Sequence, residues 1–327
     1  MSKIYLNPQL FKPEMKHEPI RAGFGRGLVE AGRHNNKVVA LCADLTESTK
    51  MDAFAAEFPD RFIEVGVAEQ NLVTLASGLA AMGKVPFTSS YAAFSPGRNW
   101  EQIRTTVCLN DVNVKIIGSH AGVSVGPDGA THQMLEDIAL MRTLPNMQVI
   151  VPCDAVQAQK ATELIAKSNK PAYLRLAREA TPVVTTADTP FTLGKAEVYR
   201  EGKDVTLAAC GTMVYQALEA AEILAKDGIA AEVINVAVIK PLDTATIVAS
   251  VRKTGCIVSA EEAQIIGGLG GAIAETLAMQ LPAPLARIGI HDEFGQSGKP
   301  DELLRHYKLM AQDIAKAAQQ VIKRKKS

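Results

Sequence analysis

Short apolar segments alternate with amphipathic ones along nearly the whole chain, and this alternation limits the possible folds more than any other feature. Parallel strands that are buried on both faces give continuous apolar runs, while the helices between them give apolar residues at helical spacing. In the first half, the expected strands are residues 37–44, 61–67, 85–91, 112–120, 147–154 and 171–178. The expected helices are residues 20–32, 68–82, 97–109, 132–142 and 154–167. The pattern predicts a doubly wound α/β fold with a mostly parallel sheet.

The alternation resumes after a stretch at 179–194 that holds Pro182, Pro190 and several threonines, as is typical of a connection between domains. Strands are expected in "DVTLAACG", "AAEVINVAVIKPLD", "CIVSAEEA" and "LARIGIHD". Helices are expected over 213–227 and 243–254, from "GGLGG" onward, and twice near the end. The prediction is therefore an N-terminal extension (1–17), a first domain (18–180), a linker (181–194) and a smaller α/β domain (195–327).

Composition excludes several classes of partner. Acidic and basic residues balance at 35 each and 47% of residues are hydrophobic, so no charge pattern favours nucleic acid or a membrane surface. No apolar run reaches the roughly 18 residues of a membrane span, and the N-terminus lacks the apolar core of a signal peptide. The five cysteines are far apart, without disulfide or zinc spacing, which favours a reducing cytoplasm. We expect a cytoplasmic protein.

Residues capable of chemistry gather where the expected parallel strands end, the edge at which open α/β sheets bind ligands. They are Asp44, Ser48, Glu69, Tyr91, Phe94, His120, Thr131, His132, Arg175 and Arg178. Taken singly, each has an ordinary explanation as a helix cap, a core side chain or a surface ion pair. Six strand ends that each carry such a residue favour loops that converge on one cleft.

"GGLGG" and "GFGRG" lack the third glycine of a dinucleotide-binding motif, and close packing explains them better.

Glu69 is the most unusual of these residues, because a carboxylate is placed where the apolar run Val65–Ala68 turns into a hydrophobic helix. A carboxylate buried among Val65, Val67, Leu72 and Val73 either remains protonated or shares a strong hydrogen bond with a basic ligand atom. Glu69 is therefore a candidate for acid/base catalysis.

Four motifs closely resemble the transketolase family of thiamine-diphosphate enzymes. They are "ADLTES", "GVAEQNLV", "PFTSSYAAF" and "GPDGATHQMLED". The resemblance implies a pyrimidine-binding domain over about residues 18–180 and the family's C-terminal domain over about 190–315. It also implies that Glu69 bonds the 1′ nitrogen of the cofactor's aminopyrimidine ring. That bond favours the imino tautomer, which takes the proton from the thiazolium carbon.

The resemblance assigns further roles by position. Tyr91 and Phe94 correspond to the aromatic wall on which the pyrimidine stacks, and Asp44 to an aspartate that helps bind cofactor across the subunit interface. His132 corresponds to the catalytic histidine near the donor's carbonyl end, and Asp128 to an aspartate that reads a donor hydroxyl. The positions that hold the substrate's phosphate are Arg21, Ser48, His120 and Arg178. Arg175 could take the place of Arg178, and Pro127 replaces an acidic residue common in the family.

The family's GDG motif, which marks the domain that binds the diphosphate through Mg²⁺, is not found in this sequence. Nothing in the chain offers carboxylate, amide and backbone donors in the arrangement that a diphosphate and its metal need. The resemblance thus implies the C-terminal subunit of a split transketolase, active only with an N-terminal subunit that holds the diphosphate and Mg²⁺. We expect no metal site of its own, sugar phosphates as substrates, and a heterotetramer of two copies of each subunit.

Three alternatives remain open. A deoxyxylulose-phosphate synthase-like subunit shares most of the motifs. The beta subunit of a 2-oxo acid dehydrogenase has the same two domains, but would have no use for "DGATHQ" and the phosphate contacts. A scaffold protein that keeps the fold without catalysis would have no need for Glu69, which is present.

Overall fold

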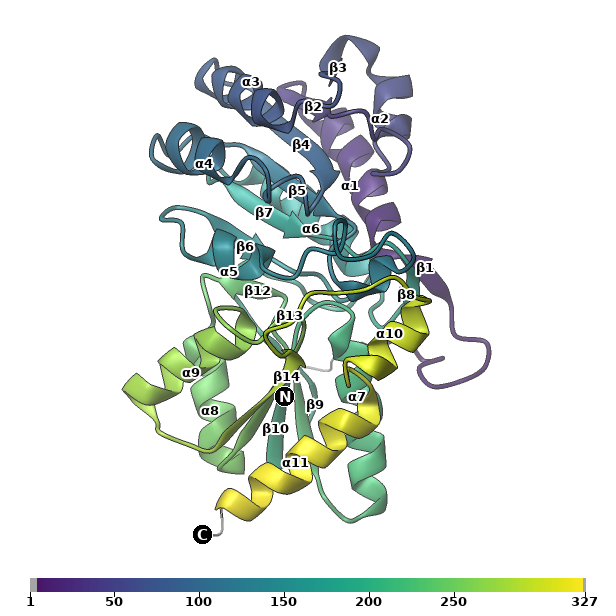
Figure 1. Ribbon diagram of the computed structural model, residues 1–327, viewed down its shortest axis with the longest axis vertical. Coiled ribbons are helices and arrows are strands. Elements are labelled where there is room, and N and C mark those ends of the chain that lie inside the picture. Colours follow the sequence, from purple (N-terminus) through teal and green to yellow (C-terminus); the bar gives the residue numbers. More distant parts are fainter. Residues whose placement is uncertain (1–4, 326–327) are drawn as a thin grey trace.

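A seven-stranded sheet with the order β12-β6-β7-β5-β4-β2-β3 forms the centre of the first domain (Figure 1). The computed structural model describes residues 5–325; the first four residues of the predicted extension and the last two of the predicted second domain lie outside it. The strands are β2 (Val38–Cys42), β3 (Phe62–Glu64), β4 (Val85–Tyr91), β5 (Lys115–Ser119), β6 (Gln148–Ile150), β7 (Ala172–Arg175) and β12 (Val238–Lys240). Their pairing is parallel except between β12 and β6.

Helices cover both faces of this sheet, as the continuous apolar runs predict. The helical elements are α1 (Ile20–His34), α2 (Asp52–Glu57), α3 (Glu69–Ala81), α4 (Trp100–Gln102), a π-helical turn η2 (Ile103–Cys108), α5 (Asp137–Arg142) and α6 (Ala155–Lys167). Alternate side chains of β2 separate into two hydrophobic clusters, with Ala40 beside α1 and α6 and Leu41 beside α3 and α5. The sheet is therefore buried on both sides.

The glycines of "GFGRG" allow α1 to lie directly against α6. A Cβ atom at Gly23 would fall 1.8 Å from the carbonyl oxygen of Ala155, and one at Gly27 would fall 2.8 Å from that of Gln159. Larger residues would push the helices apart, so close packing explains this motif.

The second domain is built on a five-stranded sheet with the order β14-β13-β10-β11-β9, parallel except at β9. Its strands are β9 (Glu197–Arg200), β10 (Val205–Ala209), β11 (Ala231–Asn235), β13 (Ile257–Gln264) and β14 (Leu285–Ile290). Its helices are α7 (Met213–Lys226), α8 (Thr244–Thr254), α9 (Leu269–Gln280), α10 (Pro300–His306) and α11 (Ala311–Lys325). In Figure 1, α8 and α9 lie on one side of this sheet and α7 and α11 on the other.

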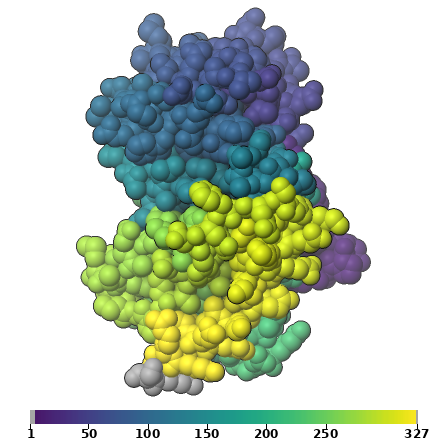
Figure 2. Space-filling model, viewed as in Figure 1, coloured from purple at the N-terminus to yellow at the C-terminus, as the bar shows by residue number. Residues whose placement is uncertain are grey.

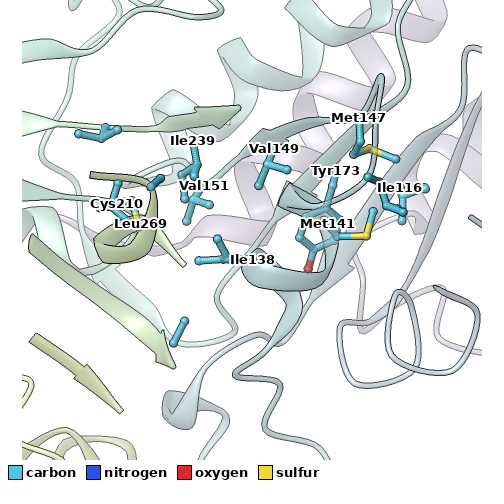
Figure 3. Packing of buried hydrophobic residues seen from close by; sticks show 14 of the residues in the cluster. Ile116, Ile138, Met141, Met147, Val149, Val151, Tyr173, Cys210, Ile239 and Leu269 are labelled. Carbon is cyan, nitrogen blue, oxygen red and sulfur yellow. The ribbon is translucent and has the colours of Figure 1, made fainter. Parts of the chain in front are cut away.

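The two domains share a strand and a hydrophobic core. β12 leaves the second domain and pairs antiparallel with β6, at the edge of the first sheet. One hydrophobic cluster runs across the junction, from Ile116 and Tyr173 in the first sheet to Cys210 and Leu269 in the second domain (Figure 3). In the space-filling view, the yellow C-terminal segment lies against the teal residues of the first domain (Figure 2).

Several expectations are corrected by the structure. Residues 230–243 form two strands instead of one, because Val151 N–H bonds the Ala237 carbonyl at 2.7 Å and draws β12 to the first sheet. β9 was not expected from the sequence. The strand expected at 61–67 ends at Glu64, because Gly66 turns the chain with a φ of +70°. The segment expected as a linker is not free: β8 (Ala180–Pro182) pairs with β1 (His17–Pro19).

Two helices begin later than expected. Residues 92–99 form turns, with Asn99 Nδ2 bonding Ser95 Oγ at 3.2 Å, so the helix expected at 97–109 begins at Trp100. The helix expected at 132–142 begins at Asp137, because Gln133 Nε2 donates to the carbonyls of Val123 and Gly126 and holds the preceding residues in a loop. No helix in residues 5–325 is both long and apolar enough to span a membrane.

Candidate active site

Residues predicted to form the site lie at the carboxyl ends of the parallel strands of the first sheet. Tyr91 is the last residue of β4 and pairs in register with Ser119, the last residue of β5, which His120 follows. Asp44 follows β2 and Arg178 follows β7. Asp44 and His120 both have a φ of 57°, in the left-handed region that non-glycine residues seldom occupy. Such a backbone turns the side chain away from the course of the strand, and it occurs often at functional sites.

Four rings from three separate segments form one cluster at this edge. The ring centroids of Tyr91 and His120 are 3.8 Å apart with an interplanar angle of 24°, and those of Tyr91 and Phe94 are 5.9 Å apart at 16°. His132 meets Phe94 edge-on at 5.4 Å and Tyr91 at 6.3 Å. The cluster offers a flat aromatic surface next to two imidazoles, which suits the stacking of a planar ring.

Glu69 is the first residue of α3, and only 4% of its surface is exposed. Its backbone carbonyl accepts a hydrogen bond of 2.8 Å from Asn99 Nδ2, so Asn99 ties Glu69 to the turn that carries Phe94. Among residues 5–325, no hydrogen bond or ion pair reaches the Glu69 carboxylate. The Glu69 oxygens are not among the fully buried side-chain atoms without a partner, so what little of the residue is exposed includes its carboxylate, which is open to a basic ligand atom.

The surroundings of Glu69 are only partly as expected. Leu72 and Val73 are fully buried beside it, but Val67 is 75% exposed and Val65 is half-buried. The reason is that the chain turns at Gly66 immediately after β3, so Val67 projects into solvent instead of continuing the strand. The carboxylate therefore lies at the boundary of the core.

Arg21 and Arg178 bring positive charge to the surroundings of His120. Arg21 donates from Nε to the Arg178 carbonyl at 3.3 Å and from Nη1 to the Ser48 carbonyl. Burial, followed by the nearby charge of Arg178, lowers the pKa of Arg21. Two guanidinium groups that repel each other are favourable only where an anion or an acidic side chain compensates them.

His120 is neutral in this setting. Burial lowers its pKa to about 3, and the charges of Arg21, Arg178 and His132 act in the same direction. Its Nδ1 lies 2.9 Å from Ser119 Oγ, which fixes the orientation of the ring. The imidazole can thus take part in hydrogen bonding to an anion without adding a charge.

The loop of residues 126–136 carries Asp128 and His132 to the same place. Arg178 donates from Nη1 to the Val125 carbonyl at 2.8 Å, and the same nitrogen lies 3.8 Å from Asp128 Oδ2. His132 is part of this loop and not of a helix, which corrects the expectation that it opens one. Its ring position comes instead from its contacts with Tyr91 and Phe94 and from Thr131 Oγ1, 2.9 Å from its Nδ1.

Asp44 lies on a loop after β2 and is exposed. Its N–H donates to Glu64 Oε1 at 2.7 Å, and Glu64 also accepts from Thr46 Oγ1 and Gly66 N–H, at 3.0 Å each. Glu64 thus holds together the loops after β2 and β3. The Asp44 carboxylate makes no hydrogen bond or ion pair with another residue of the described range 5–325.

Arg175 has a structural role, which distinguishes it from Arg178. Its Nε donates to Asp137 Oδ2 at 2.8 Å, and its Nη2 donates to the Glu262 carbonyl at 2.9 Å. Burial alone would lower the pKa of Arg175, but the Asp137 carboxylate and Tyr173 raise it above its ordinary value. The Arg175 guanidinium is committed to this buried pair, whereas Arg178 bonds the Val125 carbonyl and lies near Asp128.

Sequence reasoning missed three residues that shape the site, namely Glu64, Asn99 and Glu262. The only signal for Glu64 was an acid inside an apolar run, and for Glu262 a pair of acids inside another. Nothing in the sequence indicated Asn99. No group of three or more His, Cys, Asp or Glu side chains within residues 5–325 could hold a metal ion.

Comparison with known proteins shows which family the chain belongs to. Residues 18–183 match the transketolase pyrimidine-binding domain, and residues 194–314 match the transketolase C-terminal domain. The chain belongs to the transketolase family. The pyrimidine-binding domain of this transketolase-family chain contains Glu69 and the whole ring cluster.

Similar proteins in the family are subunits of divided transketolases. The 6-deoxy-6-sulfo-D-fructose transketolase subunit SqwH of Clostridium sp. is 42% identical over 97% of this chain and 98% of its own. A subunit of the apulose-4-phosphate transketolase of Phocaeicola vulgatus is 39% identical over 93% of this chain and 97% of its own. A solved structure described as a split gene transketolase, inactive beta4 tetramer, superposes with a TM-score of 0.88 at 46% identity, covering 93% of this chain and 98% of that one.

Proposed function

We propose that this chain is the C-terminal subunit of a split transketolase that transfers a two-carbon ketol unit between sugar phosphates. Thiamine diphosphate is bound at the interface with a separate N-terminal subunit. The observation that carries the proposal is Glu69, a residue only 4% exposed whose carboxylate has no partner within residues 5–325, together with the stacked rings of Tyr91 and Phe94.

The residues present fit the cofactor's aminopyrimidine ring. A planar, basic heterocycle needs an aromatic surface to stack on and a carboxylate to bond its ring nitrogen, and Tyr91, Phe94 and Glu69 supply both. Asp44, with its exposed and uncommitted carboxylate, is available to the cofactor from the other side of a subunit interface. When bound, thiamine diphosphate supplies the carbon nucleophile that carries the two-carbon unit.

The diphosphate and its Mg²⁺ are assigned to the partner subunit. This assignment is supported by relatives that are named as transketolase subunits. The proposed assembly is a heterotetramer with two copies of each subunit.

The substrate's anionic end is assigned to Arg21, Ser48, His120 and Arg178. Two guanidinium groups, a hydroxyl and a neutral imidazole form the kind of mixed donor set that a phosphate dianion requires. Asp128, beside Arg178, is placed to accept a hydrogen bond from a donor hydroxyl. His132, whose ring contacts Tyr91 and Phe94, is assigned to the donor's carbonyl end, where it would position the oxygen or move a proton.

One related subunit is named for a sulfonated sugar, and the same donors would bind a sulfonate. Deoxyxylulose-phosphate synthase chemistry uses a similar anionic substrate and remains a competing proposal. A 2-oxo acid dehydrogenase subunit would have no use for Arg21 and Arg178 as phosphate contacts. A non-catalytic scaffold would have no use for Glu69.

The test is reconstitution. The chain should be inactive alone with thiamine diphosphate and Mg²⁺, and mixing it with the GDG-containing subunit encoded by the same genome should restore ketol transfer. Donors ending in phosphate, in sulfonate and without an anion, together with pyruvate and branched 2-oxo acids, should be compared in the same assay. Robust turnover by the isolated chain would refute the split arrangement, and a preference for 2-oxo acids would refute ketol transfer.

A further inference from the structure

Glu262, in β13 of the second domain, reaches into the first domain. Only 3% of its surface is exposed. Its Oε1 accepts a hydrogen bond of 2.7 Å from Ser124 N–H, and its Oε2 accepts one of 2.8 Å from Thr212 Oγ1. The carboxylate therefore bridges the start of α7 and the short helix η3 (Val123–Val125), which comes directly before the loop of Asp128 and His132.

η3 connects Glu262 to Arg178 and Asp128. The carbonyl of Val125, adjacent to Ser124, accepts a hydrogen bond of 2.8 Å from Arg178 Nη1. Asp128 follows after Gly126 and Pro127 and lies 3.8 Å from the same nitrogen. A shift of η3 would thus move the acceptor that orients Arg178 and displace Asp128.

Other parts of the second domain fix the far end of the same loop. Gln133 Nε2 donates to the Gln296 carbonyl at 3.0 Å, and Gln264 N–H donates to the Leu135 carbonyl at 2.9 Å. In Figure 1, the segment that leads to α10 runs along the junction between the domains. The second domain, which lies outside the proposed site, therefore holds the loop of residues 126–136 at both ends.

Glu262 lies in close contact with the backbone at Gly122, just before η3. Gly122 has a φ of +92°, and a Cβ atom there would lie 2.2 Å from Glu262 Oε1. Glu262 and Ser124 also line a cavity of about 230 Å³ between the domains, on the side of the carboxylate away from this close contact. Its two directed hydrogen bonds are its main contribution at this position.

We propose that Glu262 is a positioning residue for the reaction. It holds η3 so that Arg178 and Asp128 face the sugar's anionic end and hydroxyl, which gives the second domain a role in substrate binding. This inference rests on the proposed function for the identity of the substrate. The control of the loop by Glu262 does not depend on it.

The test uses the neighbouring carboxylate as its control. Glu262→Leu removes both hydrogen bonds, whereas Glu262→Gln keeps the contacts, since the amide oxygen can accept from Ser124 N–H and the amide nitrogen can donate to Thr212 Oγ1. Glu261→Leu removes a buried carboxylate on the same strand that instead accepts from Leu269 N–H at 2.7 Å and Gly270 N–H at 2.8 Å. Both leucine variants lose stability, but only one touches the loop.

Two readouts separate positioning from simple destabilisation. Hydrogen exchange of the amides of residues 122–126 should speed up by about tenfold or more in Glu262→Leu, and stay near the wild-type rate in Glu262→Gln and Glu261→Leu. In the assembled enzyme, Glu262→Leu should raise KM for the sugar phosphate by about tenfold with kcat within about twofold, because the lost interactions bind the substrate. A poorly folded fraction would lower kcat and leave KM unchanged, which is the pattern expected of Glu261→Leu.

Unchanged exchange of residues 122–126 in Glu262→Leu, or equal effects of the two leucine variants on KM, would overturn the inference. If Glu262→Leu does not fold, Glu262→Asp replaces it, since a carboxylate shorter by one methylene cannot reach both donors. If the assembled enzyme turns over no sugar phosphate, the proposed function fails, and the exchange experiment still decides whether Glu262 controls the loop.

Discussion

Arg175 and Asp137 form an ion pair that is buried on both sides, with 7% and 0% of the two side chains exposed and Nε 2.8 Å from Oδ2. The Tyr173 hydroxyl donates to the same oxygen at 2.6 Å. This pair joins the end of β7 to the start of α5.

Removing Arg175 should therefore cost stability. Arg175→Met leaves the Asp137 carboxylate buried without a counter-charge, and we expect a loss of roughly 3–5 kcal/mol in the free energy of unfolding. Urea unfolding of the isolated chain measures it. Arg178→Met, at a site where a third of the side chain is exposed, is the control and should change stability by less than about 1 kcal/mol. Similar losses in the two variants would contradict the division of roles.

Glu69→Gln should fold normally and lower activity by about 10²-fold or more, the usual scale for a lost acid/base group. The amide can form a hydrogen bond, but it cannot support a protonated pyrimidine ring. The direct measurement is exchange of the cofactor's thiazolium proton for deuterium in the assembled enzyme. A mutant that exchanges at the wild-type rate would show that Glu69 is only structural.

Arg178→Ala should act selectively on substrates with an anionic end. Charge-assisted hydrogen bonds contribute about 1.5–3 kcal/mol each, so KM for a sugar phosphate should rise at least about tenfold. The turnover number should fall less, because the phosphate is held equally in the ground and transition states. Hydroxypyruvate, which has no phosphate, should be almost unaffected. Equal losses on both substrates would remove the phosphate assignment and favour 2-oxo acid chemistry.

Lys115 should make stability depend on pH. It is fully buried in β5, where its Nζ donates to the Ser168 carbonyl at 3.0 Å and the Lys170 carbonyl at 2.6 Å, just beyond α6. Burial lowers its pKa to about 7 from an ordinary value of 10.5. Between these values the unfolded chain binds more protons than the folded one, so this residue's contribution to stability increases as pH rises from about 7 to 10.

Lys115→Met isolates that contribution. The difference in unfolding free energy between the wild-type protein and the variant should shift in favour of the wild type from about pH 7 to about pH 9.5. Denaturant titrations at several pH values measure this difference. A difference that stays constant with pH would show that the ammonium group is not desolvated in the folded chain.

Val67, exposed by 75% beside Glu69, should lie in the subunit interface. Met82 after α3 and Leu109 after η2 are exposed by 83% and 76% in the same domain, and exposed apolar side chains of this size favour a protein partner. We expect an interface of more than about 2,000 Å² that includes α3 and the loops around Asp44.

Val67→Asp should weaken assembly with the N-terminal subunit by roughly tenfold or more, as measured by sedimentation velocity. Met279→Asp is the matched control, at a side chain exposed by 86% on α9 of the second domain, and it should assemble normally. Normal assembly of the Val67 variant would exclude this surface.

Much of the fold could be predicted from the sequence because buried parallel strands and their helices have a strong local signature. The α/β class, two sheets and most element positions followed from apolar periodicity alone. The convergence of Tyr91, Phe94, His120 and His132 could be expected too, since parallel strands place their carboxyl ends at one edge.

Features set by long-range hydrogen bonds could not be predicted. β12 reads as the continuation of β11, and only its pairing with β6 separates the two strands. The loop of His132 has the apolar spacing of a helix, but Gln133 bonds backbone carbonyls instead. Arg175 and Arg178 are alike in sequence, and what distinguishes them is Asp137, which is distant along the chain.

The shared strand β12 limits how such proteins can be recombined. A chimaera that joined the first domain of one transketolase subunit to the second domain of another would bring a foreign strand into its own central sheet. The first domain made alone would leave the edge of β6 unpaired, and unpaired edges promote aggregation. A swap of one domain therefore has to carry the strand β12 with it, although each domain has its own sheet.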